Sequence, residues 1–265
     1  MMIDEKTHAT LMRVSGATGI GASNLEKELQ LMSLIGKVFD AIKNAGIESA
    51  LFGGTALNKG YYAEKQRFSK DLDIDLFVKD LANAKPKLER ELRKIDGSTL
   101  KLEHSGKDAV VWSFSYGSNP WENILLEARK APLKEKLVQL EMHSILEYHG
   151  IPISPVRIPS YSLEYLLARK MIALSRRAVG KDIYDTYIGF LLQPNTKHIR
   201  RHIRHLTGED SGTVSAQALH WIGHIRPDSA DITELTETVP IAYRTSLASM
   251  LEEVKDSLRH LCARK

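Results

Sequence analysis

The fold is decided by residues 51–78, LFGGTALNKGYYAEKQRFSKDLDIDLFV. In residues 71–76, DLDIDL, acidic and apolar residues alternate, which is the period-2 pattern of a strand with one buried face. The pattern places three carboxylates on the other face, those of Asp71, Asp73 and Asp75. Carboxylates about 7 Å apart on one strand repel one another unless cations lie between them. The strand therefore indicates a site for hard divalent cations, which take oxygen ligands; the alternative is an edge strand that is charged to prevent aggregation.

A glycine pair precedes the acidic strand. Gly53 and Gly54 lack Cβ atoms, so their backbone N–H groups can approach a phosphate closely. Thr55 either adds a hydroxyl group or caps a helix through residues 56–58, whose positive end would face the anion. The glycines alone fit a simple tight turn equally well. Together with the acidic strand, they predict a site for a metal ion and a nucleotide.

The order GGTAL and then RFSKDLDID resembles the AbiEii/AbiGii toxin family of nucleotidyltransferase-fold proteins, which includes the MenT-type toxins. The resemblance implies that Gly53, Gly54 and Thr55 form a phosphate-binding motif. It implies that Asp71 and Asp73 are a metal-binding acid pair. Arg67 and Ser69 match the two polar residues that the family places just before that pair. Asp75 is an additional acid beyond the usual pair, and its role is open.

The composition is that of an ordinary globular protein. With 265 residues, 43% apolar and 26% charged, the chain can form one large domain or two small ones. A balance of 37 basic against 33 acidic residues is only mildly basic, which permits a nucleic-acid partner without requiring one. The single cysteine, Cys262, cannot form an internal disulfide, so we expect a reducing, cytoplasmic compartment. The N-terminus does not resemble a signal peptide, and no apolar run suits a membrane helix.

The pattern along the chain predicts an α/β fold, with a mixed nucleotidyltransferase-like sheet domain followed by a mostly helical C-terminal domain. We expect the first domain over residues 1–155, with a flexible N-terminal segment over 1–23, and the second over residues 156–265. Prolines near residue 155 suggest the boundary. An acid, Glu127, lies within the apolar strand candidate 123–129 and suits a third metal ligand beside Asp71 and Asp73; the alternative is a solvated edge residue paired with Arg129 or Lys130.

A second motif lies in residues 164–186, which again resemble the family, whose members place a lysine helix before a basic-Asp-x-x-Asp turn. Lys170, Asp182 and Asp185 match these positions. Lys170 lies on the apolar face of its predicted helix, so its ammonium needs an anionic partner, either nucleotide phosphates or the two aspartates. The alternative is a lysine that extends along the helix edge to solvent.

These motifs predict transfer of a nucleoside monophosphate from an NTP by a two-metal mechanism, with Mg²⁺ or Mn²⁺. Asp71, Asp73 and Glu127 would bind the metals, and Lys170 and Asp182 would complete the catalytic set; the expected nucleotide-binding residues are Gly53, Gly54, Thr55, Arg67, Ser69, Lys170 and Asp185. The resemblance implies a toxin-like enzyme that modifies an RNA acceptor, the tRNA 3′ end, with a cognate antitoxin as partner. A small-molecule acceptor of the aminoglycoside type, a protein acceptor and a non-catalytic nucleotide-binding module are the alternatives. The basic run 197–205 fits either an RNA-binding surface or a solvated helix face.

Overall fold

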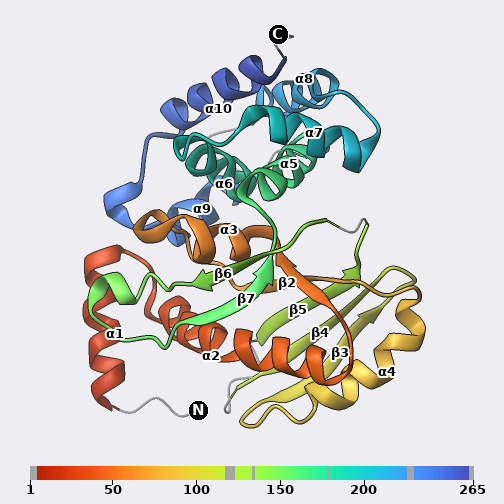
Figure 1. Cartoon of the computed structure of the whole chain (residues 1–265). Helices are drawn as coiled ribbons and strands as arrows, with labels where there is room; N and C mark the ends of the chain where they lie inside the picture. Colours follow the sequence, from red (N-terminus) through yellow and green to blue (C-terminus); the bar gives the residue numbers. More distant parts are fainter. Residues whose placement is uncertain (1–4, 117–122, 133–134, 178, 226–229, 263–265) are drawn as a thin grey trace. The chain divides into compact units, whose positions relative to one another are not determined.

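The computed structural model describes residues 5–116, 123–132, 135–177, 179–225 and 230–262 (Figure 1). The chain divides into two compact units, one formed by Met1–Glu64 and Phe68–Tyr161, the other by Lys65–Arg67 and Ser162–Lys265. The division after Tyr161 lies beyond the boundary that we expected at residue 155, because residues 156–160 form a strand of the sheet.

A mixed seven-stranded sheet forms the centre of the first unit, with the strand order β3-β4-β5-β2-β1-β7-β6. The strands are β1 (Ser49–Phe52), β2 (Asp71–Leu76), β3 (Thr99–Ser105), β4 (Ala109–Ser115), β5 (Asn123–Lys130), β6 (Val138–Met142) and β7 (Val156–Ser160). The helices of this unit are α1 (Glu5–Thr18), α2 (Ala22–Asn44), α3 (Gly53–Tyr61) and α4 (Leu81–Leu92). Strand β2 lies between β1, to which it is antiparallel, and β5, to which it is parallel. The predicted α/β architecture with a mixed sheet is therefore present.

The alternation read from the acidic strand is observed in β2. Leu72, Ile74 and Leu76 have no exposed surface, whereas Asp71 and Asp73 remain partly exposed. The apolar face continues into the neighbouring strands, since Leu72 pairs with Leu126 and Leu126 with Trp112. Burial of this continuous apolar layer stabilises the sheet by the hydrophobic effect and leaves the acidic side chains on the opposite face.

The N-terminal segment that we expected to be flexible is instead helical over residues 5–18. Leu11 and Val14 of α1, with Ile20 and Leu25 beyond it, form a buried apolar cluster with residues of the segment 145–151. The partner of α1 lies more than a hundred residues away in the sequence, so local composition could not reveal it.

A buried ion pair attaches α3 to α2. Lys59 Nζ lies 2.5 Å from Glu28 Oε1, and neither side chain is exposed. Ser144 Oγ donates a hydrogen bond of 2.7 Å to the same carboxylate oxygen. Because an uncompensated buried charge is costly, loss of either partner would destabilise this junction. The pair therefore helps to hold the helix that begins at Gly53.

The second unit is helical. Its helices are α5 (Leu163–Leu174), α6 (Gly180–Leu191), α7 (Thr196–Thr207), α8 (Ser211–Ile222), α9 (Ala230–Thr238) and α10 (Leu247–Cys262). A short 3₁₀ turn of this unit covers Ile241–Tyr243, another in the first unit covers Glu147–His149, and a third, Ala63–Lys65, spans the division between the units after Glu64. Ser162 caps α5 as its sequence predicts, because its hydroxyl accepts a hydrogen bond from the Tyr165 N–H. The packing of α5 against α6, α7 and α8 makes it the central helix of this unit.

Candidate active site

In the first unit the sheet register brings two predicted metal ligands together. Asp73 of β2 pairs with Glu127 of the parallel strand β5, and both side chains are partly exposed. Residues paired directly across neighbouring strands lie on the same face, and the strands are about 5 Å apart. The prediction that Glu127 lies beside the acidic strand is therefore confirmed. Asp71 pairs with Leu125, one step along the same face.

On its other side Asp73 meets the glycine turn. Phe52, the last residue of β1, pairs with Asp73, and α3 begins at the next residue. Gly53 has a φ of +76°, which side chains other than that of glycine rarely adopt, and a Cβ placed there would lie 2.1 Å from Asp73 Oδ2. The carboxylate thus packs directly against the backbone of the helix start. The first N–H groups of a helix lack intrahelical partners and favour anions, so this turn can receive a phosphate next to the Asp73 carboxylate.

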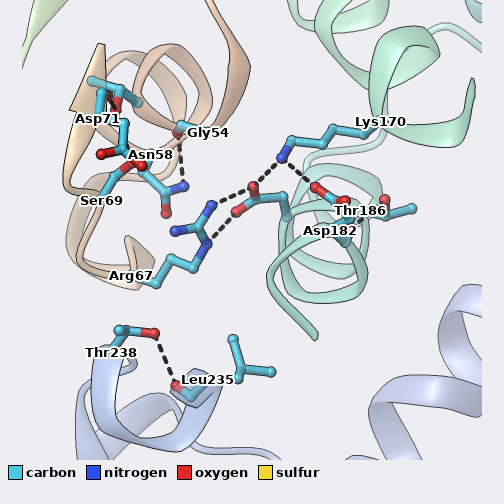
Figure 2. A network of polar contacts seen from close by, with 12 residues as sticks. Gly54, Asn58, Arg67, Ser69, Asp71, Lys170, Asp182, Thr186, Leu235 and Thr238 are labelled. Atoms are coloured by element: carbon cyan, nitrogen blue, oxygen red, sulfur yellow. Dashed lines mark hydrogen bonds and ion pairs between the residues drawn. The ribbon is translucent and has the colours of Figure 1, made fainter. Parts of the chain in front are cut away.

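Thr55 does not cap a helix, because α3 starts two residues earlier with Phe52 as its N-cap. Its hydroxyl instead lies 2.8 Å from Ser69 Oγ and donates a hydrogen bond of 2.5 Å to the Asp71 carbonyl oxygen. These bonds connect the first turn of α3 to the start of β2. In the same helix, Asn58 Nδ2 donates to the Gly54 carbonyl oxygen at 2.8 Å (Figure 2). Thr55 and Ser69 therefore stabilise the segment that leads into Asp71 and Asp73, and Asn58 stabilises the first turns of α3.

Asp75, the acid whose role the sequence left open, has no exposed surface. Its carboxylate accepts hydrogen bonds from Tyr161 Oη at 2.8 Å and from Arg129 Nε at 3.2 Å. Burial raises the pKa of Asp75 to about 6, although Arg129 and Tyr161 favour its charged form. The Arg129 guanidinium in turn lies 3.9 Å from the centroid of the Phe52 ring, directly before Gly53. Asp75 therefore acts as a support for the glycine turn.

The second unit contains a buried network of two cations and two carboxylates, shown in Figure 2. Lys170 Nζ lies 2.7 Å from Asp182 Oδ1 and 2.8 Å from Asp185 Oδ2. Arg67 donates to Asp185 through Nε at 2.9 Å and through Nη2 at 2.8 Å. All four residues are at most 9% exposed. Two positive and two negative charges balance, which lowers the cost of burying them.

The local sequence explains how this network forms. Asp182 and Asp185 are three residues apart at the start of α6 and share one face of the helix. Lys170 projects from the buried face of α5, so the prediction that it needs an anionic partner is confirmed by its contacts with both aspartates. The side chain is not extended to solvent. Tyr184 Oη donates a hydrogen bond of 2.7 Å to the Lys65 carbonyl oxygen, which holds the segment Lys65–Arg67 against α6.

The electrostatics keep Lys170 and Asp185 charged. Burial would lower the pKa of Lys170, but Asp185 and Asp182 outweigh it and raise this pKa above its ordinary value. Burial likewise opposes ionisation of Asp185, yet Arg67 and Lys170 lower the pKa of that carboxyl to about 2. Sequence reasoning matched Arg67 to the family pattern but missed its pairing with Asp185, since no local signal connects residues 118 positions apart.

The available metal ligands are the carboxylates of the first unit. Among the described residues, no three His, Cys, Asp or Glu side chains already converge on one point. The neighbouring pair Asp73 and Glu127, with Asp71 beside it, nevertheless fits Mg²⁺, which typically binds through one or two carboxylates together with substrate phosphates and water. The donor set is entirely oxygen, as hard divalent cations require.

The model of one protein family covers most of the chain. It is described as the nucleotidyl transferase AbiEii toxin of a type IV toxin–antitoxin system, and it matches residues 42–264. The chain belongs to the AbiEii family. The match includes both the glycine–acid motif and the Lys170 network, so the resemblance inferred from the sequence is confirmed. The AbiEii assignment identifies the chain as a member of a nucleotidyltransferase toxin family.

Structural comparison supports the AbiEii fold. MenT4, a nucleotidyltransferase toxin from Mycobacterium tuberculosis H37Rv, matches with a TM-score of 0.63 over 98% of this chain and 90% of that chain. The two sequences are 14% identical, so this likeness concerns the fold. No curated protein matches the sequence. Within the part of the chain that the structure describes, every helix is too short or too polar to cross a membrane.

Proposed function

We propose that this AbiEii-family protein is a metal-dependent nucleotidyltransferase that transfers NMP from an NTP to an acceptor hydroxyl. The observation that carries the proposal is the position of Asp73, between Glu127 on one neighbouring strand and the Gly53 turn on the other. This arrangement combines oxygen ligands for a cation with backbone donors for a phosphate. Few purely structural reasons exist to expose two carboxylates side by side at a helix N-terminus.

Within this proposal Asp71, Asp73 and Glu127 hold Mg²⁺ or Mn²⁺. When bound, such ions lower the pKa of an attacking hydroxyl and stabilise a leaving pyrophosphate. Gly53 and Gly54 offer N–H groups to the phosphates of the NTP without steric hindrance. Thr55 and Ser69, joined by their hydroxyl groups, keep the loop in the conformation that makes those donors available.

We assign Lys170, Asp182, Asp185 and Arg67 to the same reaction because the family match spans both groups of residues. An ammonium has three donors, and Lys170 directs two of them to Asp182 and Asp185. In the proposed reaction the remaining donor binds a nucleotide phosphate. In this role Asp182 and Asp185 orient Lys170, and Arg67 holds Asp185 through two parallel hydrogen bonds.

The proposed acceptor is RNA, at the tRNA 3′ end, and the proposed protein partner is a cognate antitoxin, as the description of the family as part of a type IV toxin–antitoxin system suggests. The likeness in fold to MenT4, itself described as a nucleotidyltransferase toxin, supports the reaction class. A cytoplasmic location follows from this proposal, because NTPs and tRNA are found there.

The test is label transfer from each of four α-³²P-NTPs, with Mg²⁺, into total tRNA and into the protein itself. Wild type is compared with Asp73→Asn and with the control Asp80→Asn. Asp80 is an exposed N-cap of α4, and asparagine caps a helix equally well. We expect labelled tRNA with wild type and Asp80→Asn and none with Asp73→Asn.

Other outcomes separate the alternatives. Label in the protein alone would replace the RNA acceptor by a protein acceptor. NTP binding without any label would direct the search to small molecules such as aminoglycosides. Absence of Mg²⁺-dependent NTP binding, or full activity of Asp73→Asn, would refute the proposed reaction.

A further inference from the structure

Helix α7 (Thr196–Thr207) contains four lysine or arginine residues and no acidic residue. Its buried side consists of Ile199, His202 and Ile203, which face the rest of the second unit. The cations on its outer side include Lys197, Arg201 and Arg204, all of which are exposed; we call these three residues the α7 basic row. The helix therefore separates a buried side from an outer side on which Lys197, Arg201 and Arg204 carry positive charge and to which α7 contributes no acid.

The spacing of the α7 basic row makes it a linear feature. Residues four and three positions apart in a helix lie one above the other on the same face. From Lys197 to Arg204 the helix rises by about 10 Å. The three charges thus follow one another along the helix axis, as the phosphates of a nucleic-acid strand follow its backbone.

The charges of the α7 basic row are not neutralised within the described part of the chain. There, Lys197, Arg201 and Arg204 form neither an ion pair nor a hydrogen bond through their side chains. Some cations on other helices are paired with acids: Arg93, the C-cap of α4, is 2.5 Å from Glu89, and Arg259 of α10 is 2.6 Å from Asp256. Among the described residues, Lys37 and Lys43 of α2 have no such partner. Like charges on one helix face repel and destabilise it slightly, so an acid-free row is costly unless an external anion binds it.

The chemistry of α7 favours a phosphate backbone over an acidic protein. Protein interfaces are centred on exposed apolar or aromatic anchors, whereas the isoleucines of α7, Ile199 and Ile203, have no exposed surface. Arginine matches phosphate through two parallel hydrogen bonds, and lysine binds it as a point charge. The acidic residues nearest in sequence, Glu209 and Asp210, lie beyond the C-terminal end of the helix, and Asp210 caps α8.

We infer that the α7 basic row binds the sugar–phosphate backbone of the acceptor RNA. The identity of this acceptor rests on the proposed function, but the surface lies outside the proposed catalytic residues. Phosphate contacts position a nucleic acid without reading its sequence. The row therefore contributes to affinity for RNA and leaves the choice of NTP to the site residues.

The size of the effect follows from counterion release. Each phosphate contact contributes about 0.7 to 0.9 to the slope of log affinity against log salt concentration. Removing three contacts should make this slope shallower by roughly 2 to 3 and weaken binding about tenfold or more at about 50 mM salt.

The experiment measures fluorescence anisotropy of 5′-labelled tRNA with the full chain between about 50 and about 200 mM salt. The test variant is Lys197→Gln/Arg201→Gln/Arg204→Gln, because glutamine has nearly the helix propensity of lysine and arginine. The matched control, Lys37→Gln/Lys43→Gln/Lys87→Gln, removes three exposed lysines from α2 and α4. A second variant, Lys197→Arg/Arg201→Lys/Arg204→Lys, keeps all three charges in α7. Mg²⁺-NTP binding is measured for each protein.

We expect the test variant to bind RNA more weakly and with less dependence on salt than wild type. The control and the charge-preserving variant should bind RNA nearly as wild type does. Mg²⁺-NTP binding should be equal in all four proteins. Equal losses in the test and control variants would overturn the inference, since net charge alone would explain them. Unchanged RNA binding and transfer in the test variant would overturn it while leaving the proposed reaction intact. Loss of binding to an antitoxin but not to RNA would also overturn it and assign α7 to a protein interface. Absence of RNA binding by wild type, with transfer to another acceptor, would reject the inference and the proposed RNA acceptor while leaving the proposed reaction class intact.

Discussion

Replacing Gly53 by alanine would place a methyl group where the Asp73 carboxylate now lies. The new Cβ would be 2.1 Å from Asp73 Oδ2 and 3.0 Å from Cγ, whereas ordinary contacts of a Cβ begin at 3.4 Å. Asp73 must therefore move by more than about 1 Å, because backbone atoms on the Gly53 side cannot yield without unwinding the start of α3. The substitution thus acts on the position of a proposed metal ligand.

Two costs of this substitution can be separated. A residue with a Cβ at positive φ costs about 1–2 kcal/mol wherever it occurs. Gly97 has a φ of +79°, and a Cβ added there would meet no atom within 4 Å, so Gly97→Ala carries the backbone cost without the steric one. A displacement of about 1 Å in a reacting group can cost about a hundredfold in rate, which corresponds to about 2.7 kcal/mol of activation free energy.

The assay measures urea unfolding and the rate of label transfer for wild type, Gly53→Ala and Gly97→Ala. We expect Gly97→Ala to lose stability by the backbone cost alone and Gly53→Ala to lose at least as much. Only Gly53→Ala should lose transfer, by about a hundredfold. If folded Gly53→Ala transferred label as fast as Gly97→Ala, the reasoning would be refuted. Transfer would then not depend on the exact position of the Asp73 carboxylate.

Four further predictions concern the charged residues. Glu127→Gln should leave the urea midpoint nearly unchanged, because the side chain is partly exposed, and should lower transfer at least about tenfold with a raised Mg²⁺ requirement; an unchanged Mg²⁺ titration would argue against a ligand role. Lys170→Met should destabilise the protein by about 3–5 kcal/mol, since it leaves two buried carboxylates with Arg67 as their one buried cation in this network. Adding Asp182→Asn should recover part of that loss in urea unfolding; purely additive losses would contradict the pairing. The pKa of Asp185 is lowered from 3.8 to about 2, so its charged carboxyl should add about 2 kcal/mol to the free energy of unfolding above pH 3.8. This contribution should be lost as the pH falls toward 2. For Asp75, whose pKa is raised to about 6, stability should instead increase as the pH falls from 6 toward 3.8; unfolding curves that were flat across both ranges would contradict these shifts.

Much of the site could be predicted from local sequence. The alternation in residues 71–76 determines which face of β2 is buried, because side chains of a strand point alternately to its two faces. The helical spacing around Lys170 likewise places its ammonium on a buried face and creates the need for an anion. The glycine pair indicates a turn at the start of a helix, which α3 confirms.

Local sequence could not determine which distant groups meet these residues. The role of Asp75 depends on Tyr161, 86 residues away, and the α1 cluster depends on the segment 145–151. The periodicity of apolar residues indicates only which face of a strand or helix is buried. Which distant residue contacts that face depends on strand register and helix packing across the whole chain.

The sequence by itself determined which chemical groups the candidate site contains: a glycine turn, an acidic strand and a buried lysine with two acids. These features depend only on residue type and short-range spacing. Only the tertiary structure decided that Glu127 is in register with Asp73, that Gly53 packs against the Asp73 carboxylate, and that Arg67 holds Asp185. Hydrogen bonds and ion pairs act over only a few ångströms, so such pairings exist only once folding has brought the residues together.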